Sequence, residues 1–162
     1  MADELSASQY QIAPGTAITS ITYYTTLGGN IPADKPLKIW MANTDISTYE
    51  STSAWIPAEQ FTLVFDGMVD LSASGNQDFN ILLDTPFEYS GQNLAIMILR
   101  PMDENTYSTT NKFYYTVTAN YPYRMLYRYS STVVFDPADP GSGTCVNNVP
   151  NASFTFSTAG FA

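Results

Sequence analysis

Short runs of alternating apolar and polar residues dominate this chain, and turn-forming residues separate them. The runs are rich in β-branched and aromatic residues, and Gly, Pro, Asn or Asp fills the gaps between them. No stretch keeps a helical period for longer than about two turns. Many short strands in 162 residues predict an all-β fold, a two-sheet antiparallel β-sandwich of jelly-roll type that spans residues 1–162 as one domain.

Period-two alternation assigns a core face to the predicted strands. In the run 37–41, Leu37, Ile39 and Met41 face the core, and Trp40 faces away from it. The same rule predicts inward-facing residues in two further runs, Phe61, Leu63 and Phe65 in one and Phe79, Ile81 and Leu83 in the other. The run LAIMIL (94–99) is apolar on both faces, which predicts a central strand covered on both sides.

Residues 111–130 concentrate tyrosine and positive charge, and alternation predicts that most of this stretch lies inside the sandwich. Two strands are expected, 112–118 and 123–130. The inward residues would be Phe113, Tyr115 and Val117 in the first strand, and Tyr123, Met125, Tyr127 and Tyr129 in the second. The opposite choice would bury Arg124 and Arg128, which is costly unless both are paired. The exposed aromatic platform is then reduced to Tyr114 and Tyr121.

The charge balance limits the classes of partner that this chain can bind. A net charge of −9 argues against nucleic acid and anionic membranes, which need basic surfaces, and keeping the protein soluble is the plain explanation of the charge. Six residues, 94–99, form the longest apolar run, which is too short for membrane insertion. Little lysine and much Tyr, Thr, Ser and Asn favour an extracellular or cell-surface location, as a domain excised from a longer secreted or surface protein.

Two residue counts exclude several kinds of chemistry. The chain contains no histidine, which removes the Ser-His-Asp and Cys-His nucleophile arrangements and His-ligated metal sites. Cys145 is the single cysteine and lies in a predicted loop, where an inert thiol is the simplest interpretation. No cofactor is required, and a metal would need oxygen ligands, as calcium does.

Both tryptophans are candidates for ligand binding. Trp40 should point outward, where its ring could stack on a sugar; the alternative is a Trp covered by a loop or a neighbouring domain. Trp55 lies in a long polar loop and is either a ligand contact or a plug that closes one end of the sandwich.

Four further residues of the tyrosine-rich stretch complete the ligand-binding candidates: Tyr114, Tyr121, Arg124 and Arg128. For the two arginines, cross-strand pairing with Asp or Glu is one explanation. Stacking on Tyr114, or bidentate capture of a carboxylate ligand, is the other.

Loop oxygens supply candidate ligands for a structural calcium ion, although Asx turns and Asp-Pro turns explain the same residues. These candidates are Asn43, Asp45, Asp136 and Asp139. A glycosidase needs two carboxyl groups about 5–10 Å apart. Five carboxylates outside these loops show no motif for that role: Glu59, Asp66, Asp70, Asp84 and Glu88.

Three segments together resemble the cleaved-adhesin (gingipain adhesin-like) domain of secreted and surface proteins from gut and oral anaerobic bacteria. They are LKIWMANTDISTYESTSAWIP (37–57), FTLVFDGMVDLS (61–72) and TPFEYSGQNL (85–94). The resemblance covers roughly residues 8–157. It implies a jelly roll, an extracellular setting, adhesive or carbohydrate-binding roles and structural calcium. The chain departs from the family at Asp78-Phe79, where Gly-Trp is common. Family members also often have an extra strand before the stretch that corresponds to ADELSASQYQI (2–12).

Three functions follow from these observations. The first is a non-catalytic extracellular adhesion or carbohydrate-binding module, whose partner is a glycan or a host or cell-surface protein. The second is a structural spacer or accessory domain packed against neighbouring domains of its parent chain, through an apolar patch around Trp40 and Leu82. The third, for which only permissive features exist, is a carboxylate-based glycoside hydrolase.

Overall fold

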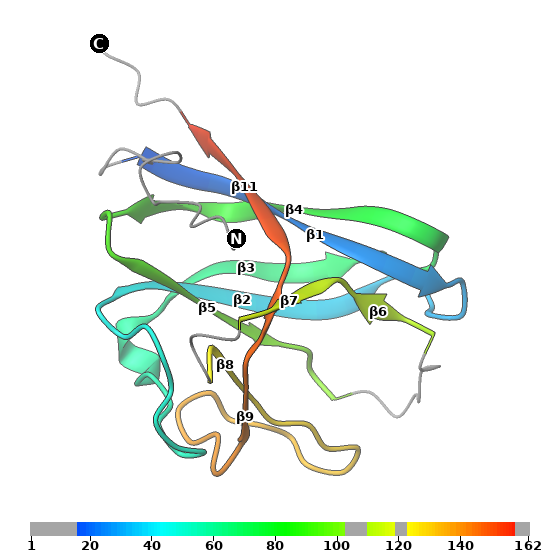
Figure 1. Cartoon of the computed structure of the whole chain (residues 1–162). Helices are drawn as coiled ribbons and strands as arrows, with labels where there is room; N and C mark the ends of the chain where they lie inside the picture. Colours follow the sequence, from blue (N-terminus) through cyan, green and yellow to red (C-terminus); the bar gives the residue numbers. More distant parts are fainter. Residues whose placement is uncertain (1–15, 103–109, 119–122, 158–162) are drawn as a thin grey trace, which may run out of the picture.

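The computed structural model describes residues 16–102, 110–118 and 123–157, which form an almost entirely β structure (Figure 1). Antiparallel strands are packed in layers, and the only helical element in these ranges is the 3₁₀ turn η2 (Ala58–Gln60). The predicted all-β sandwich is confirmed, while the jelly-roll order of its strands stays a prediction. No helix in the described ranges is long and apolar enough to cross a membrane.

The first sheet is built around β1 (Thr16–Gly28). One edge of β1 pairs along its full length with β4 (Ser74–Tyr89). The other edge pairs first with β11 (Ala152–Ser157) and then with the short β6 (Lys112–Phe113). Hydroxyl and amide side chains cover the outer face of this sheet, where Asn80 Nδ2 donates to Thr22 Oγ1 at 2.7 Å.

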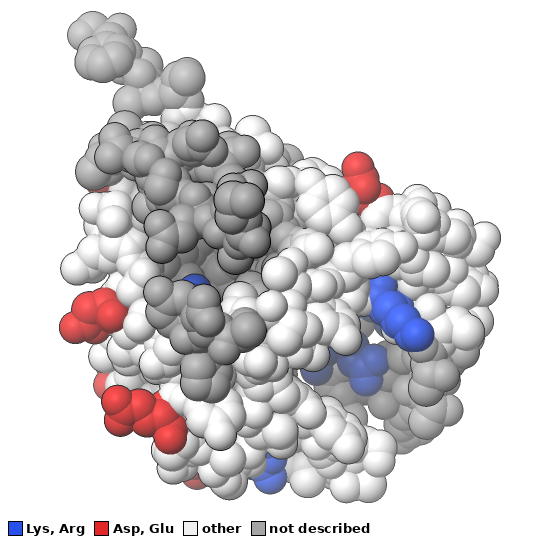
Figure 2. Space-filling view, viewed as in Figure 1, with Lys and Arg blue, Asp and Glu red and all other residues white. Residues whose placement is uncertain are grey.

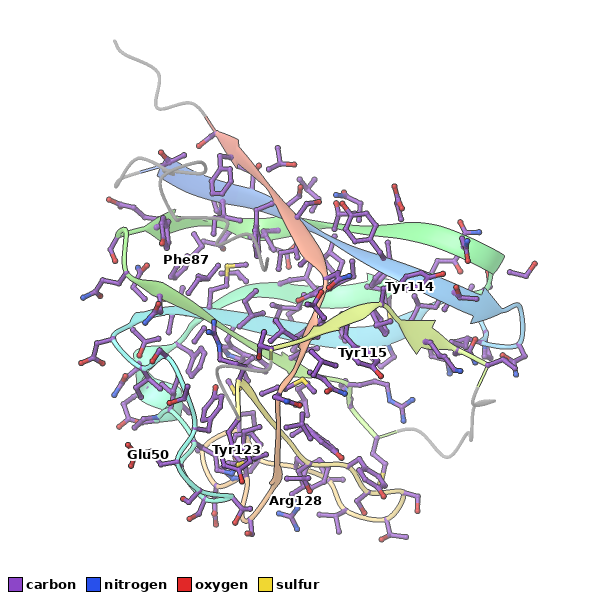
Figure 3. The ribbon with its side chains drawn as sticks, viewed as in Figure 1. Glu50, Phe87, Tyr114, Tyr115, Tyr123 and Arg128 are labelled. Atoms are coloured by element: carbon purple, nitrogen blue, oxygen red, sulfur yellow. The ribbon has the colours of Figure 1, made fainter. Side chains whose placement is uncertain are left out.

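The second sheet has the strand order β3 (Thr62–Val69), β2 (Lys35–Thr44) and β5 (Asn93–Leu99). Its inner face packs against the first sheet. The core between the sheets contains Ile21, Ile39 and Met41, each fully shielded from solvent. Figure 3 shows Phe87 reaching into this space from β4. The predicted inward faces of the runs 37–41 and 79–83 are confirmed.

Short strands and loops form a third layer beneath the second sheet (Figure 1). β8 (Met125–Tyr127) pairs there with β9 (Thr144–Val146). A further ribbon joins β7 (Tyr115–Val117) to β10 (Asn148–Pro150). Ala42 and Thr44 point away from the core but are almost fully buried. The outer face of β2 is therefore covered as well.

Tyr23 is buried in the core, with its ring edge-on to Phe113 at 5.8 Å, and burial raises its pKa from 10.0 to about 12. The Tyr23 hydroxyl loses its proton more easily in the unfolded chain than in the folded protein. The stability contributed by the protonated hydroxyl is therefore complete below pH 10 and declines toward pH 12. Wild-type stability should therefore fall by up to about 2–3 kcal/mol more than that of Tyr23→Phe over this interval. Urea unfolding of both proteins at several pH values measures the difference, and parallel curves would contradict the prediction.

A β-bulge corrects the predicted inward face of β3. Ile39 pairs with Phe65 and Trp40 pairs with Leu63, so Val64 is an extra residue between the two pairs. Val64 is buried and Leu63 is 41% exposed, the reverse of the predicted alternation. The extra residue rotates the strand, which a strict period of two cannot represent.

The prediction that 94–99 is a central strand is wrong for the described part of the chain. β5 pairs only with β2 there and forms the end of its sheet. Its inward residues Leu94 and Ile96 pack against the core. Its other face lies on the side of the third layer, so both faces favour apolar residues although the strand is at an edge.

The predicted core faces of the tyrosine-rich stretch are also wrong. Phe113, Tyr115 and Val117 are 43%, 55% and 55% exposed. Both β6 and β7 are short strands at the rim: β6 joins β1 over two residues and β7 forms a two-stranded ribbon. Alternation in such strands does not distinguish a core face from a solvent face.

Around β8 the prediction is only partly right: Arg124 and Arg128 are exposed as predicted, and Met125 and Tyr127 are half-buried. Tyr123 and Tyr129 are exposed, and Leu126 is the buried residue. Tyr123 has a φ of 61°, outside the extended region, and only residues 125–127 form a strand. The alternation ends within three residues, so Arg124 and Arg128 remain exposed although they flank buried Leu126.

Candidate functional site

Trp40 points away from the core, as predicted, but it is half-buried between covered neighbours. It faces the third layer, as the alternative of a loop-covered Trp requires. Leu82, which is 70% exposed, lies on the outer face of the first sheet. The two residues therefore lie on opposite sides of the sandwich, and the single apolar patch expected around them does not exist.

A groove in the third layer brings Trp55 together with polar side chains from a distant part of the sequence. One wall comes from residues 53–59 and the other from residues 137–142, and the volume is about 490 Å³. Its polar side chains are the hydroxyls of Ser53 and Ser142 and the carboxylates of Glu59 and Asp139. We call it the Trp55 groove.

Direct hydrogen bonds hold the two walls together. The Trp55 indole Nε1 donates to the Gly141 carbonyl at 2.6 Å. Below it, the Gly143 amide donates to the Thr52 carbonyl at 2.7 Å. The Ser142 hydroxyl donates to Thr52 Oγ1 at 3.1 Å. Because Trp55 anchors both loops and also lines the groove, the plug and the ligand contact that were alternatives in the sequence can coexist.

Two glycines permit this close approach. At Gly143 a Cβ would lie 2.8 Å from both the Trp55 ring and the Tyr127 carbonyl oxygen. Gly141 has a φ of +68°, and a Cβ there would meet the Arg128 guanidinium. The Gly-Ser-Gly sequence of the loop is therefore a requirement of the junction with Trp55.

Arg128 supports the second wall from behind. Its Nη1 donates to the Pro140 carbonyl, and its guanidinium lies 4.9 Å from the centre of the Phe135 ring. Figure 3 shows Arg128 at the lower end of the third layer. Arg128 and Trp55 thus hold consecutive carbonyls of one loop, which gives Arg128 a positioning role, while its predicted capture of a carboxylate ligand stays a prediction.

Arg128→Lys should loosen this loop, because lysine offers neither the planar stacking surface nor the fork of donors. We expect hydrogen exchange at the Gly143 amide to accelerate about threefold to tenfold. Exchange followed by NMR measures this, with the Leu83 amide in β4 as an internal reference. Equal exchange rates in the two proteins would show that Arg128 does not hold the loop.

Neither Tyr114 nor Arg124 lines this groove. Tyr114 is 46% exposed and its hydroxyl lies 2.8 Å from Thr26 Oγ1 and 3.2 Å from Asn76 Oδ1, at the rim of the first sheet. Arg124 is exposed and engaged in an interaction of its own. Tyr121 lies outside the described residues. Figure 3 places Tyr114 well above Arg128, so Tyr114 and the groove lie on separate surfaces.

The four calcium candidates form two separate sets of turn contacts. Both polar atoms of the Asn43 side chain are hydrogen-bonded at the β4–β5 turn. Its Nδ2 donates to the Glu88 carbonyl and its Oδ1 accepts from the Ser90 amide, both at 3.0 Å. The Asp45 carbonyl accepts from the Asn93 side chain at 3.3 Å.

In the second set, Asp136 Oδ1 accepts the Ala138 amide at 2.9 Å, which is an Asx turn, and the Asp139 amide donates to the Asp136 carbonyl at 3.1 Å. Residues 16–102, 110–118 and 123–157 contain no group of three or more His, Cys, Asp or Glu that could hold a metal ion. Calcium binding stays an untested prediction.

Most of the other carboxylates also have structural contacts. Asp66 forms an ion pair with Lys38 Nζ at 2.8 Å. Asp84 Oδ2 accepts a hydrogen bond from the Asp66 amide at 2.8 Å, which satisfies a backbone donor at the outer edge of β3. Hydrogen bonds from the Ser72 side chain and amide lower the pKa of Asp70. Glu59 differs because it lines the Trp55 groove.

Sequence reasoning identified Trp55 and Asp139 separately but did not bring them together, and it missed Ser53 and Ser142. Their only sequence signal is the Ser-, Pro- and Gly-rich character of the two loops. No family model matches this chain, and comparisons with curated proteins and with solved structures found no match.

Proposed function

We propose that this protein is a non-catalytic extracellular adhesion or carbohydrate-binding module that binds uncharged sugars in the Trp55 groove. The observation that supports this proposal is the combination of an indole, two hydroxyls and two carboxylates along one open groove. Sugar rings carry apolar C–H faces that stack on aromatic rings, while their hydroxyls need acceptors.

The indole can offer its ring face to a sugar because its N–H already donates to Gly141. The carboxylates of Glu59 and Asp139 have acceptor capacity for sugar hydroxyls, and charge-assisted hydrogen bonds are stronger than neutral ones. A volume of about 490 Å³ falls within the range of small-ligand sites. The groove therefore suits one or two sugar units.

The resemblance to cleaved-adhesin domains agrees with this proposal, as does an extracellular or cell-surface location. The biological partner would be a glycan, either free or on a host or cell-surface protein. A groove built from loops on a packed scaffold is a common arrangement for recognition, because the loops vary while the scaffold stays rigid.

A glycan array followed by titration of the strongest neutral hits tests the proposal. Glu59→Gln and Asp139→Asn should each weaken binding about tenfold, because each removes charge from an acceptor of sugar hydroxyls. Asp78→Asn is the matched control, since it removes the same charge from the exposed outer face of the first sheet.

Each contrary result has a definite meaning. An array without hits, together with self-association of the isolated protein, would favour the spacer or accessory domain. Release of reducing sugar that disappears in both groove variants would identify a glycoside hydrolase. Equal losses in all three variants would show that net charge, and not the groove, governs binding.

A further inference from the structure

A second cavity lies between the outer face of the second sheet and the loop 130–135. Its volume is about 200 Å³. Lys38 from β2 and Leu99 from β5, which are paired across the sheet, form its inner wall. Ser130 and residues 100–102 and 133–135 complete the lining, and we call it the basic cavity.

The charge of this cavity is opposite to that of the protein. Two of the six basic residues of the chain, Lys38 and Arg100, line it, and no described carboxylate does. Figure 2 shows basic side chains on the right of the molecule, near β6 and below it, whereas acidic side chains on this face lie mainly along the left side. In a protein with a net charge of −9, this places local positive potential at one concave site.

Lys38 keeps donor capacity for a ligand while holding its existing contact. Lys38 Nζ donates to Asp66 Oδ2 at 2.8 Å, and an ammonium group has three donors. Arg100, which has an interaction of its own, brings a second positive charge to the lining. An incoming carboxylate can therefore add to the Lys38–Asp66 contact rather than replace it.

Apart from Ser130, the rest of the lining is apolar and partly open to solvent. Met102 is 41% exposed and Val134 is 74% exposed, both unusual for apolar side chains beside a cavity. The Arg128 guanidinium lies over the ring of Phe135, 4.9 Å from its centre. Apolar surface next to two cations matches a molecule with a compact apolar body and one negative group.

We propose that the basic cavity binds a small organic carboxylate with a compact apolar body, such as an aromatic or short aliphatic acid. Inorganic phosphate would leave the apolar lining unused, and a neutral apolar molecule would leave both cations unused. The Trp55 groove has the opposite character, since it is lined by carboxylates and hydroxyls. The two sites should therefore select different ligands.

Titration of the whole protein with benzoate, followed by amide chemical shifts, tests this site, with benzamide as the uncharged equivalent. At about 10 mM benzoate, enough to saturate a site with Kd near 1 mM, shifts are expected at Leu99, Val134 and Phe135. Benzamide should bind about tenfold more weakly because it lacks the charge-assisted contacts.

Lys38→Gln should weaken benzoate binding about tenfold, whereas Lys112→Gln, which removes the same charge from β6 outside the cavity, should not. Val134→Asp provides a second variant at an exposed position, and its carboxylate should repel benzoate without disturbing the core. The proposal is wrong if benzoate causes no shifts at the cavity, if benzamide binds equally well, or if Lys112→Gln has the effect of Lys38→Gln.

Discussion

Trp55→Ala should raise the Kd for the sugar identified on the array by at least about 30-fold, the size expected when a central aromatic anchor is removed. Two losses combine in this variant. The ring that would stack on the sugar disappears, and so does the Nε1 hydrogen bond to the Gly141 carbonyl that joins the groove walls. Isothermal titration calorimetry measures the change, with circular dichroism to confirm that the strands are intact.

Trp55→Phe separates the two contributions. Phenylalanine keeps an aromatic face but cannot donate to Gly141, so its loss of affinity should be smaller than that of alanine. If folded Trp55→Ala binds like the wild type, the ring is only a plug between the loops and the sugar site lies elsewhere.

Ile39→Ala should lower the free energy of unfolding by about 2–5 kcal/mol, the range for removing a large aliphatic side chain from a packed core. Ile39 has no exposed surface and lies at the centre of β2, whose two edges are paired with β3 and β5. A cavity there cannot close easily because the strands on both sides are fixed. Urea unfolding measures the loss.

Ile98→Ala is the matched control, since Ile98 pairs directly with Ile39 but is 46% exposed at the sheet edge. Its cost should be clearly smaller, about 1 kcal/mol. Equal losses for the two variants would contradict the position of the core that the structure assigns.

Alternation in the sequence predicts the fold well where strands are long and paired on both sides. In β2, every second residue from Leu37 to Met41 packs against the first sheet, as expected. The same holds for Ile81 and Leu83 in β4. Each of these strands packs one face against the other sheet, so that face is shielded from water and the period of two identifies the core residues.

Alternation fails where backbone geometry interrupts it. The bulge at Val64 depends on how β3 meets β2, which its own residues do not reveal. Tyr123, at a φ of 61°, ends the alternation before β8 begins. The third layer also covers the outer face of the second sheet, so both faces of β5 favour apolar residues. Its fully apolar run therefore predicted a central strand, although β5 lies at the edge of the sheet in the described part of the chain.

The Trp55 groove was beyond sequence reasoning for a different reason. Its walls come from loops whose joining residues, Trp55 and Gly141, are 86 positions apart. Loop residues have no period that would align one loop with the other. Trp55 could be selected for its residue type alone, but its polar neighbours depend on the pairing of β8 with β9, which brings residues 137–142 to it.

The two indole N–H resonances of the chain provide the most direct measurement of the central claim, that sugar binds in the Trp55 groove. Trp40 and Trp55 are the only tryptophans, so two signals report two separate surfaces. Titration with the sugar selected on the array should shift the Trp55 signal and leave the Trp40 signal in place. A shift of Trp40 with Trp55 unchanged would contradict the account.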